Sequence, residues 1–234
     1  MSPAEKLRQE KELLGLYLSG HPLNIYAGLD QALATFSGSL EDCKLSKADR
    51  SHNVRICGII EDIAIKFTAD NRKFATFAVE TRRDKYHLVC FPSDYQEHGE
   101  NIKDGAHVIL DCELRYRDRQ EEWSLQVSRI SPMEQQLPRL MKKVIFVLNP
   151  EEDVPAFIEN KLLRHVGENS GGTRIALAHR QPDGALIEAD LPEHIKTFFP
   201  VEKFAALIKD PAVLGYRVDA SAPYRRPPRF PSRK

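Results

Sequence analysis

The stretch Val54-Arg55-Ile56-Cys57-Gly58-Ile59-Ile60-Glu61-Asp62-Ile63 decides the fold, because it is an apolar, β-branched run interrupted by one glycine. Four similar runs follow it: Lys73–Glu80, Tyr86–Phe91, Ala106–Glu113 and Trp123–Ile130. Short β-rich runs separated by turn residues are typical of a sandwich or a barrel. Five strands, with room for a short helix between the third and the fourth, predict an OB barrel, a fold that commonly binds single-stranded nucleic acid.

The composition narrows the class of protein. The chain has 234 residues, of which 41% are hydrophobic and 29% charged, so we expect one large or two modest globular domains. The formal net charge is zero, so any nucleic-acid binding must depend on local patches. There is no signal-peptide pattern or membrane-length apolar run, and Cys43, Cys57, Cys90 and Cys112 form no C-x-x-C pair. We therefore expect a cytoplasmic protein with buried thiols, no membrane contact, and neither a metal nor a cofactor.

Residues 1–50 read as a helical lead-in to the OB domain, which we place at residues 51–133. Leucines recur at roughly helical spacing over Ala4–Ser19, and a second short helix is expected over Leu23–Phe36. After the barrel, two prolines predict that Ser131–Leu140 is a connector.

The order β-α-β-β-α-β is predicted for residues 141–220, which indicates a small split ferredoxin-like α+β domain. Its two helices should bury their apolar faces on one sheet. The side chains expected in that core are Phe157, Leu162, Phe204 and Leu207. Residues 221–234 form a basic, proline-rich tail, which we expect to be solvated and disordered.

A resemblance to a known family is carried by Glu10-Lys11-Glu12-Leu13-Leu14-Gly15-Leu16-Tyr17-Leu18-Ser19-Gly20-His21-Pro22-Leu23. These residues closely resemble the segment before the OB domain in the alpha subunit of bacterial DNA polymerase III. The barrel is similar too, at Gly58-Ile59-Ile60, Phe77-Ala78-Val79-Glu80 and Val89-Cys90-Phe91-Pro92. The resemblance covers most of the chain. It implies a mixed β and α+β fold whose last domain contacts the clamp-loader tau subunit.

One turn departs from the family pattern. Family members usually carry an acidic residue and a glycine after the second strand, where this chain has Thr81-Arg82-Arg83-Asp84-Lys85. Because this turn has no glycine, its sequence does not define the geometry of the hairpin. Its three basic residues make it more positively charged than the family pattern.

No catalytic centre is expected, although the family is a DNA-directed DNA polymerase. Polymerase chemistry needs clustered carboxylates that hold two magnesium ions, and the palm motifs that supply them are not in this sequence. Glu61 and Asp62 are adjacent in a strand, so they should point to opposite faces. Asp111 and Glu113 should form a solvent-facing acidic pair, and His21 should have a structural role at a helix end.

Binding is therefore the expected activity, because single-strand binders combine cations on the backbone path with stacking aromatic rings. Alternation places Ala75, Phe77 and Val79 in the core with Ile59 and Ile63, and leaves Phe74 outside as a stacking candidate. The candidate contacts are Lys66, Phe67, Arg72, Lys73, Phe74, Arg82, Arg83, Lys85, Arg115, Tyr116, Arg117 and Arg119. Nearby acids (Asp118, Glu121 and Glu122) should keep the affinity modest and salt-sensitive.

We therefore expect a non-catalytic C-terminal module of a bacterial replicative polymerase alpha subunit. It would bind single-stranded DNA weakly and contact tau and other subunits of the polymerase III holoenzyme. One alternative is a stand-alone OB protein that binds RNA or tRNA, which would leave Glu10–Pro22 unexplained. The other is a protein-interaction scaffold without nucleic-acid binding, which the zero net charge favours.

Overall fold

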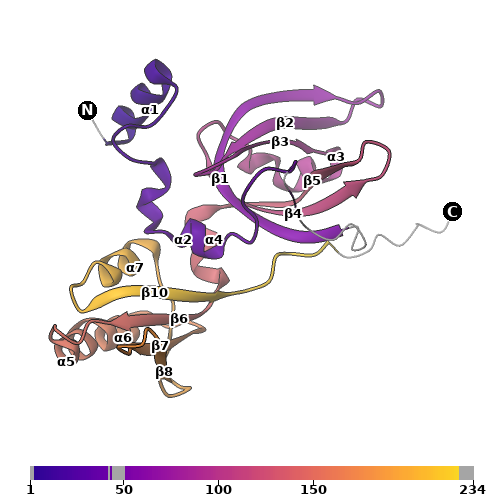
Figure 1. Ribbon diagram of the computed structural model, residues 1–234. Helices are drawn as coiled ribbons and strands as arrows, with labels where there is room; N and C mark the ends of the chain where they lie inside the picture. Colours follow the sequence, from indigo (N-terminus) through magenta and orange to yellow (C-terminus); the bar gives the residue numbers. More distant parts are fainter. Residues whose placement is uncertain (1–2, 42, 44–50, 227–234) are drawn as a thin grey trace, which may run out of the picture. The chain divides into compact units, whose positions relative to one another are not determined.

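The computed structural model describes residues 3–41, 43 and 51–226, which divide into two compact units (Figure 1). The barrel unit comprises the described parts of Ala34–Met133 and Ala222–Lys234. The α+β unit comprises those of Met1–Leu33 and Glu134–Ser221. The chain thus passes between the units three times, which differs from the consecutive segments expected from the sequence.

The barrel unit holds the five predicted strands. They are β1 (Ser51–Phe67), β2 (Lys73–Glu80), β3 (Lys85–Cys90), β4 (His107–Arg117) and β5 (Glu122–Pro132). The sheet order is β3-β2-β1-β4-β5 with antiparallel pairs, and β3 also lies against β5, which closes the barrel. Helix α3 (Pro92–His98) and the 3-10 turn η2 (Gly99–Asn101) separate β3 from β4, and α3 packs on β2 and β5. This is the OB arrangement, so the predicted fold class is confirmed.

Strand β1 departs from simple alternation at two places. A Cβ at Gly58 would lie 2.5 Å from Val79 Cγ1, so only glycine lets β1 and β2 approach this closely. At Asp62 the backbone has φ +54°, and the pairing with β2 shifts between Glu61 and Ala64. This bulge changes the face that each residue presents. Ile60, rather than the predicted Ile59, continues the core face of Val54 and Ile56, and beyond the bulge Ile63 packs against the same core.

A buried ion pair crosses the outside of β1 and β4. Arg55 Nε donates to Asp111 Oδ1 at 3.1 Å, and the two side chains are 1% and 5% exposed. The expectation that Asp111 faces solvent is wrong, because Arg55, its partner in the strand register, neutralises it. The neighbouring Glu113 pairs instead with Arg115 at 2.7 Å.

Residues Ala222–Arg226 return to the barrel, and we call them the strap. Arg55 Nη2 donates to the Ala222 carbonyl at 3.1 Å, and the Tyr224 ring lies 3.8 Å below the Arg129 guanidinium. Arg226 donates to buried Asp94 and to the Val127 carbonyl. The strap has no helix or strand, as Pro223 predicts, but these contacts differ from the solvated tail that we expected. The rest of the predicted tail lies outside the described residues.

The α+β unit contains one mixed sheet. Its strands are β6 (Met141–Leu148), β7 (Thr173–Arg180), β8 (Leu186–Asp190), the short β9 (Lys196–Thr197) and β10 (Val213–Ala220). The order is β10-β6-β7-β8, with β9 paired to β7. The predicted succession of strands and helices is present, but β6 pairs directly and in parallel with β7. No strand is inserted between them, so the pairing differs from the split ferredoxin-like arrangement.

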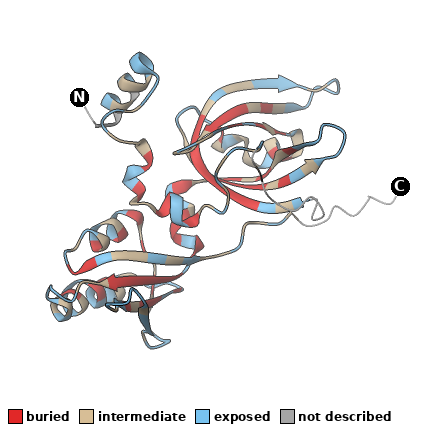
Figure 2. Ribbon diagram, in the orientation of Figure 1, coloured by how far each residue is buried: buried red, intermediate tan, exposed pale blue. Residues whose placement is uncertain are grey.

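Helices cover one face of this sheet. They are α5 (Val154–Phe157), the π-helical turn η3 (Ile158–Leu162), α6 (Leu163–Glu168) and α7 (Val201–Ile208). Phe146 of β6 packs edge-on against Phe157 and Phe199 and more obliquely on Phe204. The burial predicted for Phe157, Leu162, Phe204 and Leu207 is confirmed. Figure 2 shows that buried residues follow the strands, whereas the hairpin tips are exposed.

The lead-in is helical, but it is shorter and more broken than predicted. It contains α1 (Pro3–Leu14), the 3-10 turn η1 (Pro22–Tyr26) and α2 (Leu29–Leu33). His21 caps η1, because its Nδ1 accepts from Leu23 N at 3.1 Å, and this supports the structural role expected for it. η1 packs on α7 and α2 on β10, and Tyr216 Oη donates to the Ala27 carbonyl at 2.7 Å.

The segment predicted as a connector is a helix, α4 (Met133–Leu140), with Pro138 inside it. Met133, Leu137 and Leu140 are buried, and their helical spacing explains why a helix forms despite the proline. None of the helices in the described ranges combines the length and the apolar character that crossing a bilayer requires.

Candidate nucleic-acid interface

The tip of the β1–β2 hairpin gathers five of the predicted contacts. Lys66 pairs with Phe74 and Phe67 with Lys73 across the two strands. The side chains of Lys66, Phe67 and Lys73 are exposed, and Phe67 is 56% exposed. Arg72 pairs with Asp70 at 2.7 Å, which partly neutralises it. The hairpin therefore presents cations beside an accessible aromatic ring, the combination that single-strand binding needs.

The outer face of β2 is distinct from its core face. Ala75, Phe77 and Val79 are buried in the barrel core, as predicted. Phe74 is only partly buried and lies on the opposite face, beside Lys66 in the register. The side of Phe74 predicted from the sequence is therefore correct, while its stacking role stays a prediction.

A groove runs beside this hairpin, about 660 Å³ in volume. It is lined by Arg72 of the β1–β2 turn, by Lys73 of β2 and by residues of α3 and η2, among them Tyr95. Gly99 lies close to the Tyr95 ring, since an added Cβ would be 3.1 Å from its nearest atoms. Tyr95 could not be predicted from the sequence, because it belongs to a helix whose placement beside β2 depends on tertiary packing.

The β2–β3 turn holds three further predicted cations. It closes without glycine because the Thr81 hydroxyl accepts from Asp84 N at 3.0 Å, and Thr81 N donates to the Asp84 carbonyl at 2.8 Å. Lys85 contacts both Asp62 and Glu61, at 2.8 and 3.0 Å, and these hydrogen bonds raise the pKa of Lys85. Lys85 is thus paired within the barrel, which makes it a poor candidate for a phosphate contact.

The same contacts correct the expectation for the two acids. The bulge at Asp62 turns its carboxylate toward the same lysine that Glu61 contacts, so the two do not point to opposite faces. The Lys85 ammonium also lowers the pKa of Asp62, first through the hydrogen bond and then through its charge.

The β4–β5 hairpin carries the remaining candidates. Arg117 and Arg119 are exposed, whereas Arg115 is paired with Glu113. Tyr116 is partly buried and packs edge-on against buried Trp123, with ring centroids 5.4 Å apart. This packing fixes Tyr116 at the barrel surface. In Figure 1 this hairpin and the β1–β2 hairpin extend on the same side of the barrel.

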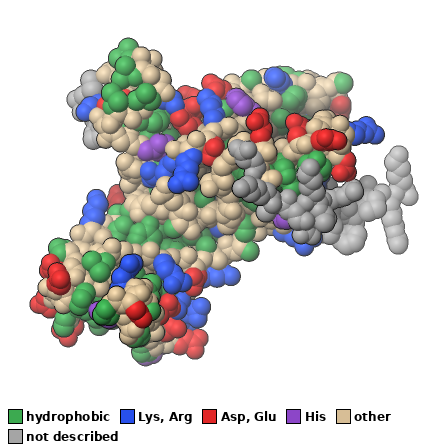
Figure 3. Space-filling view, viewed as in Figure 1, with side chains coloured by type: hydrophobic (Ala, Val, Ile, Leu, Met, Phe, Trp, Pro, Cys, Tyr) green, Lys and Arg blue, Asp and Glu red, His purple; other side chains and the backbone are tan. Residues whose placement is uncertain are grey.

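The structure does not bring all twelve predicted residues together. The β1–β2 tip and the β2–β3 turn lie at opposite ends of β2, a strand of eight residues. At the usual rise of a strand, this separates Arg82 and Arg83 from Arg72 and Lys73 by roughly 25 Å. Figure 3 shows cationic and acidic side chains interspersed over the visible face. The field of the barrel is therefore patchy, and the β1–β2 tip with its groove is the most coherent candidate surface.

Comparisons with known proteins give several DNA polymerase III alpha subunits as sequence relatives. The chain is similar to the DNA polymerase III alpha subunit of Mycobacterium tuberculosis, with 29% identity over 119 residues, which cover 48% of this chain and 9% of that protein. The Aquifex aeolicus subunit is 30% identical over 106 residues, or 45% of this chain and 9% of that protein. The Haemophilus influenzae subunit is 24% identical over 178 residues, or 75% of this chain and 15% of that protein.

Other comparisons add less. No protein-family profile matches the chain. A solved structure of a mitochondrial single-stranded DNA binding protein from S. cerevisiae aligns with a TM-score of 0.29 and 18% identity, covering 35% of this chain and 95% of that one. The matched polymerase subunits are far longer than this chain, which spans only 9% to 15% of those described. The resemblance inferred from the sequence is nevertheless confirmed: the chain is similar to a limited region of the bacterial DNA polymerase III alpha subunit.

Proposed function

We propose that this chain is a non-catalytic module of a bacterial replicative polymerase, whose barrel binds single-stranded DNA weakly and with little sequence preference. The observation that carries the proposal is the β1–β2 tip, where Lys66, Phe67, Lys73 and Phe74 lie together on an OB barrel. Homology to the polymerase subunit supports DNA as the nucleic acid and the bacterial cytoplasm as the compartment.

The expected affinity is low because three of the candidate cations have acidic partners. Arg72 pairs with Asp70, Arg115 with Glu113, and Lys85 with Glu61 and Asp62. Each such ion pair must break before the cation can neutralise a phosphate, and this reduces the binding free energy that the phosphate contact contributes. A module with such a low affinity would bind single-stranded DNA that a larger assembly already holds close to it.

Fluorescence anisotropy of a labelled single-stranded oligonucleotide, measured at several salt concentrations, tests the proposal. Each phosphate neutralised on a single strand should contribute about −0.7 to the slope of log affinity against log salt. The double variant Arg72→Ala/Lys73→Ala should weaken binding and flatten that slope. The matched control Arg82→Ala/Arg83→Ala makes the same charge change at the far end of β2 and should have a much smaller effect.

The aromatic part of the surface is tested separately. Phe74→Ala should weaken binding by about 1–3 kcal/mol if the ring stacks on a base, and it should leave the salt slope nearly unchanged. Absence of binding at low salt would favour the scaffold alternative, and equal losses in the two arginine-containing variants would rule out the β1–β2 tip as the contact surface. Preference for an RNA oligonucleotide over the DNA of the same sequence would favour the RNA-binding alternative.

We also propose that the α+β unit contacts the clamp-loader tau subunit, as the family resemblance implies. Strand β8 is an edge strand whose residues are mostly exposed, and Ile187 on it is 56% exposed. An exposed edge strand can accept a strand from a partner protein. Ile187→Pro should then reduce capture of the purified tau subunit by the immobilised chain, whereas Leu214→Pro on β10 should not. Retention of tau by the Ile187 variant at wild-type affinity would rule out this edge.

A further inference from the structure

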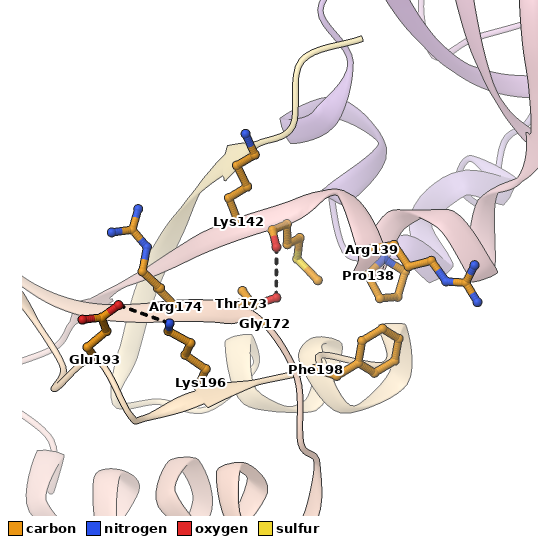
Figure 4. A pocket seen from close by; sticks show the side chains of 10 residues that line it. Pro138, Arg139, Lys142, Gly172, Thr173, Arg174, Glu193, Lys196 and Phe198 are labelled. Atoms are coloured by element: carbon orange, nitrogen blue, oxygen red, sulfur yellow. Dashed lines mark hydrogen bonds and ion pairs between the residues drawn. The ribbon is translucent and has the colours of Figure 1, made fainter. Parts of the chain in front are cut away.

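The α+β unit has a hollow of its own, about 560 Å³ in volume, which we call the basic hollow. Figure 4 shows the side chains around it. Its charged and aromatic lining comprises Arg139, Lys142, Arg174, Lys196, Glu193 and Phe198. Four cations and one carboxylate give this lining a formal charge of +3. The volume lies within the range of pockets that hold small molecules.

The cations come from separate elements and are largely uncompensated. Arg139 is in the last turn of α4, Lys142 is in β6, Arg174 in β7 and Lys196 in β9. Across residues 3–41, 43 and 51–226, the first three have no carboxylate within ion-pair distance. Lys196 pairs only loosely with Glu193, at 3.5 Å, and that carboxylate is 89% exposed.

The neighbouring lysine of β6 provides a contrast. Lys143 pairs with Asp190 at 2.7 Å and with Glu188, and these hydrogen bonds raise its pKa. Carboxylates of the neighbouring strand β8 therefore neutralise Lys143, whereas Lys142 and Arg174, which line the hollow, have no carboxylate partner among the described residues. The cations that share the hollow repel each other, and the fold provides no carboxylate that would cancel this repulsion for Lys142 and Arg174. An anionic ligand bound between them would lower the repulsion.

The other end of the hollow is apolar, and hydrogen bonds of the backbone fix the position of the segment that carries Phe198. Phe198 and Pro138 lie close together in Figure 4. Phe198 N donates to the Asn169 carbonyl at 3.2 Å, and His165 Nε2 donates to the Phe198 carbonyl at 3.1 Å. A Cβ at Gly171 would lie 2.4 Å from Phe198 N, so glycine is required for this close approach. The ring is thus fixed where it lines the hollow.

We propose that the basic hollow binds a nucleoside phosphate, with the phosphate among Lys142, Arg174 and Lys196 and the base against Phe198. Arginine and lysine are the residues that bind phosphate oxygens, and an aromatic face suits a base. Lys196 and Phe198 are two residues apart on an extended segment, roughly 7 Å, a separation that a nucleotide can bridge. The ligand has two possible sources, a free nucleotide or a nucleotide within a single strand. The inference stands apart from the barrel proposal.

Titration calorimetry with thymidine monophosphate, inorganic phosphate and a short oligothymidylate tests the inference on the whole chain. The background should carry Arg72→Ala/Lys73→Ala, so that the barrel tip does not contribute. Adding Lys142→Ala/Arg174→Ala should weaken binding of the monophosphate by about tenfold or more, because charge-assisted hydrogen bonds are lost. The matched control Arg180→Ala/Lys209→Ala removes two exposed cations outside the hollow and should change binding less than twofold.

Phe198→Leu separates base recognition from simple charge attraction, since leucine fills the space without offering an aromatic face. It should weaken the monophosphate severalfold and leave inorganic phosphate unchanged, with the thermal midpoint confirming that the variant is folded. Tighter binding of the oligonucleotide than of the monophosphate assigns the hollow to a strand, and equal binding assigns it to a free nucleotide. The proposal is overturned by no binding of either at millimolar concentration. It is also overturned by equal losses in test and control pairs, or by a hexaglutamate peptide that binds as tightly.

Discussion

At the scale of single residues, the barrel depends on a charged pair that no periodicity could have revealed. Asp111 alternates with apolar residues in β4, and this pattern predicts that its side chain faces solvent. It is buried because Arg55, on the adjacent strand, carries the complementary charge and the strap carbonyl of Ala222 takes a further guanidinium hydrogen bond. Only the register of β1 against β4 brings the two residues together.

Asp111→Ala should therefore be strongly destabilising. Removing one partner of a buried pair leaves the other charge uncompensated, which typically costs about 3–5 kcal/mol. The double variant Arg55→Met/Asp111→Leu removes both charges and should recover most of that loss. Urea denaturation of both proteins measures the difference. If the single variant is as stable as the wild type, the pair contributes nothing and the burial argument is wrong.

His165 gives the α+β unit a dependence on pH. Burial lowers the pKa of this imidazole, which stacks on Phe199 with ring centroids 5.0 Å apart. The unfolded chain therefore takes up a proton more readily than the folded chain as the pH falls below about 6.5. Stability should be full above that value and decrease on acidification. Thermal midpoints between pH 7.5 and 5 should show a shallower decline in His165→Gln than in the control His194→Gln, whose side chain is exposed.

At the scale of elements, the sequence predicted strands better than it predicted their irregularities. β2 follows strict alternation, and its core face was assigned correctly from the pattern. In β1 the core face follows Val54, Ile56 and Ile60, so the assignment of Ile59 to the core was wrong by one position. Ile63 reaches the core only because a bulge at Asp62 shifts the faces, and a bulge has no signature in hydrophobic periodicity. α4 was missed because two prolines were given more weight than the helical spacing of Met133, Leu137 and Leu140.

The helix pair α5–α6 offers a direct check of the element assignments. Leu162 is fully buried at the π-helical turn between them. Leu162→Ala should cost roughly 2–5 kcal/mol, since it leaves a cavity beneath the sheet. Its neighbour Leu163 is 38% exposed, so Leu163→Ala is a control for the loss of a leucine from the same turn. Differential scanning calorimetry should show a markedly lower midpoint for the first variant only.

The candidate site also contains residues that the sequence predicts and residues that it does not. Its cations and Phe74 were predictable because hairpin position and alternation follow from the sequence. The partners of those cations were not, since Asp70, Glu113 and the Glu61–Asp62 pair act through hairpin geometry and a bulge. The groove beside Tyr95 and the basic hollow were not predictable either, because each is lined by elements that only tertiary packing brings together.

At the scale of the whole molecule, the strap extends the barrel beyond its five strands. Asp94 in α3 is buried, and Arg226 is its ionic partner. Arg226→Ala should lower the stability of the barrel by about 1–3 kcal/mol, because a buried acceptor loses its charged donor. Arg225→Ala removes an exposed arginine next to it and should be nearly neutral. Guanidine denaturation followed by the fluorescence of Trp123 reports on the barrel, and equal midpoints for both variants would contradict the role of the strap.

The interleaved path of the chain has a consequence for its synthesis. The hydrogen bond from Tyr216 to the Ala27 carbonyl joins residues 189 positions apart, and the lead-in belongs to the same compact unit as β10. On the ribosome, the lead-in therefore emerges long before its packing partner exists, while the strands of the barrel can pair as they appear. The apolar side chains of η1 and α2 must remain unpacked until β10 has been translated. Nascent chains stalled before β10 should accordingly show a protease-resistant barrel preceded by a cleavable lead-in.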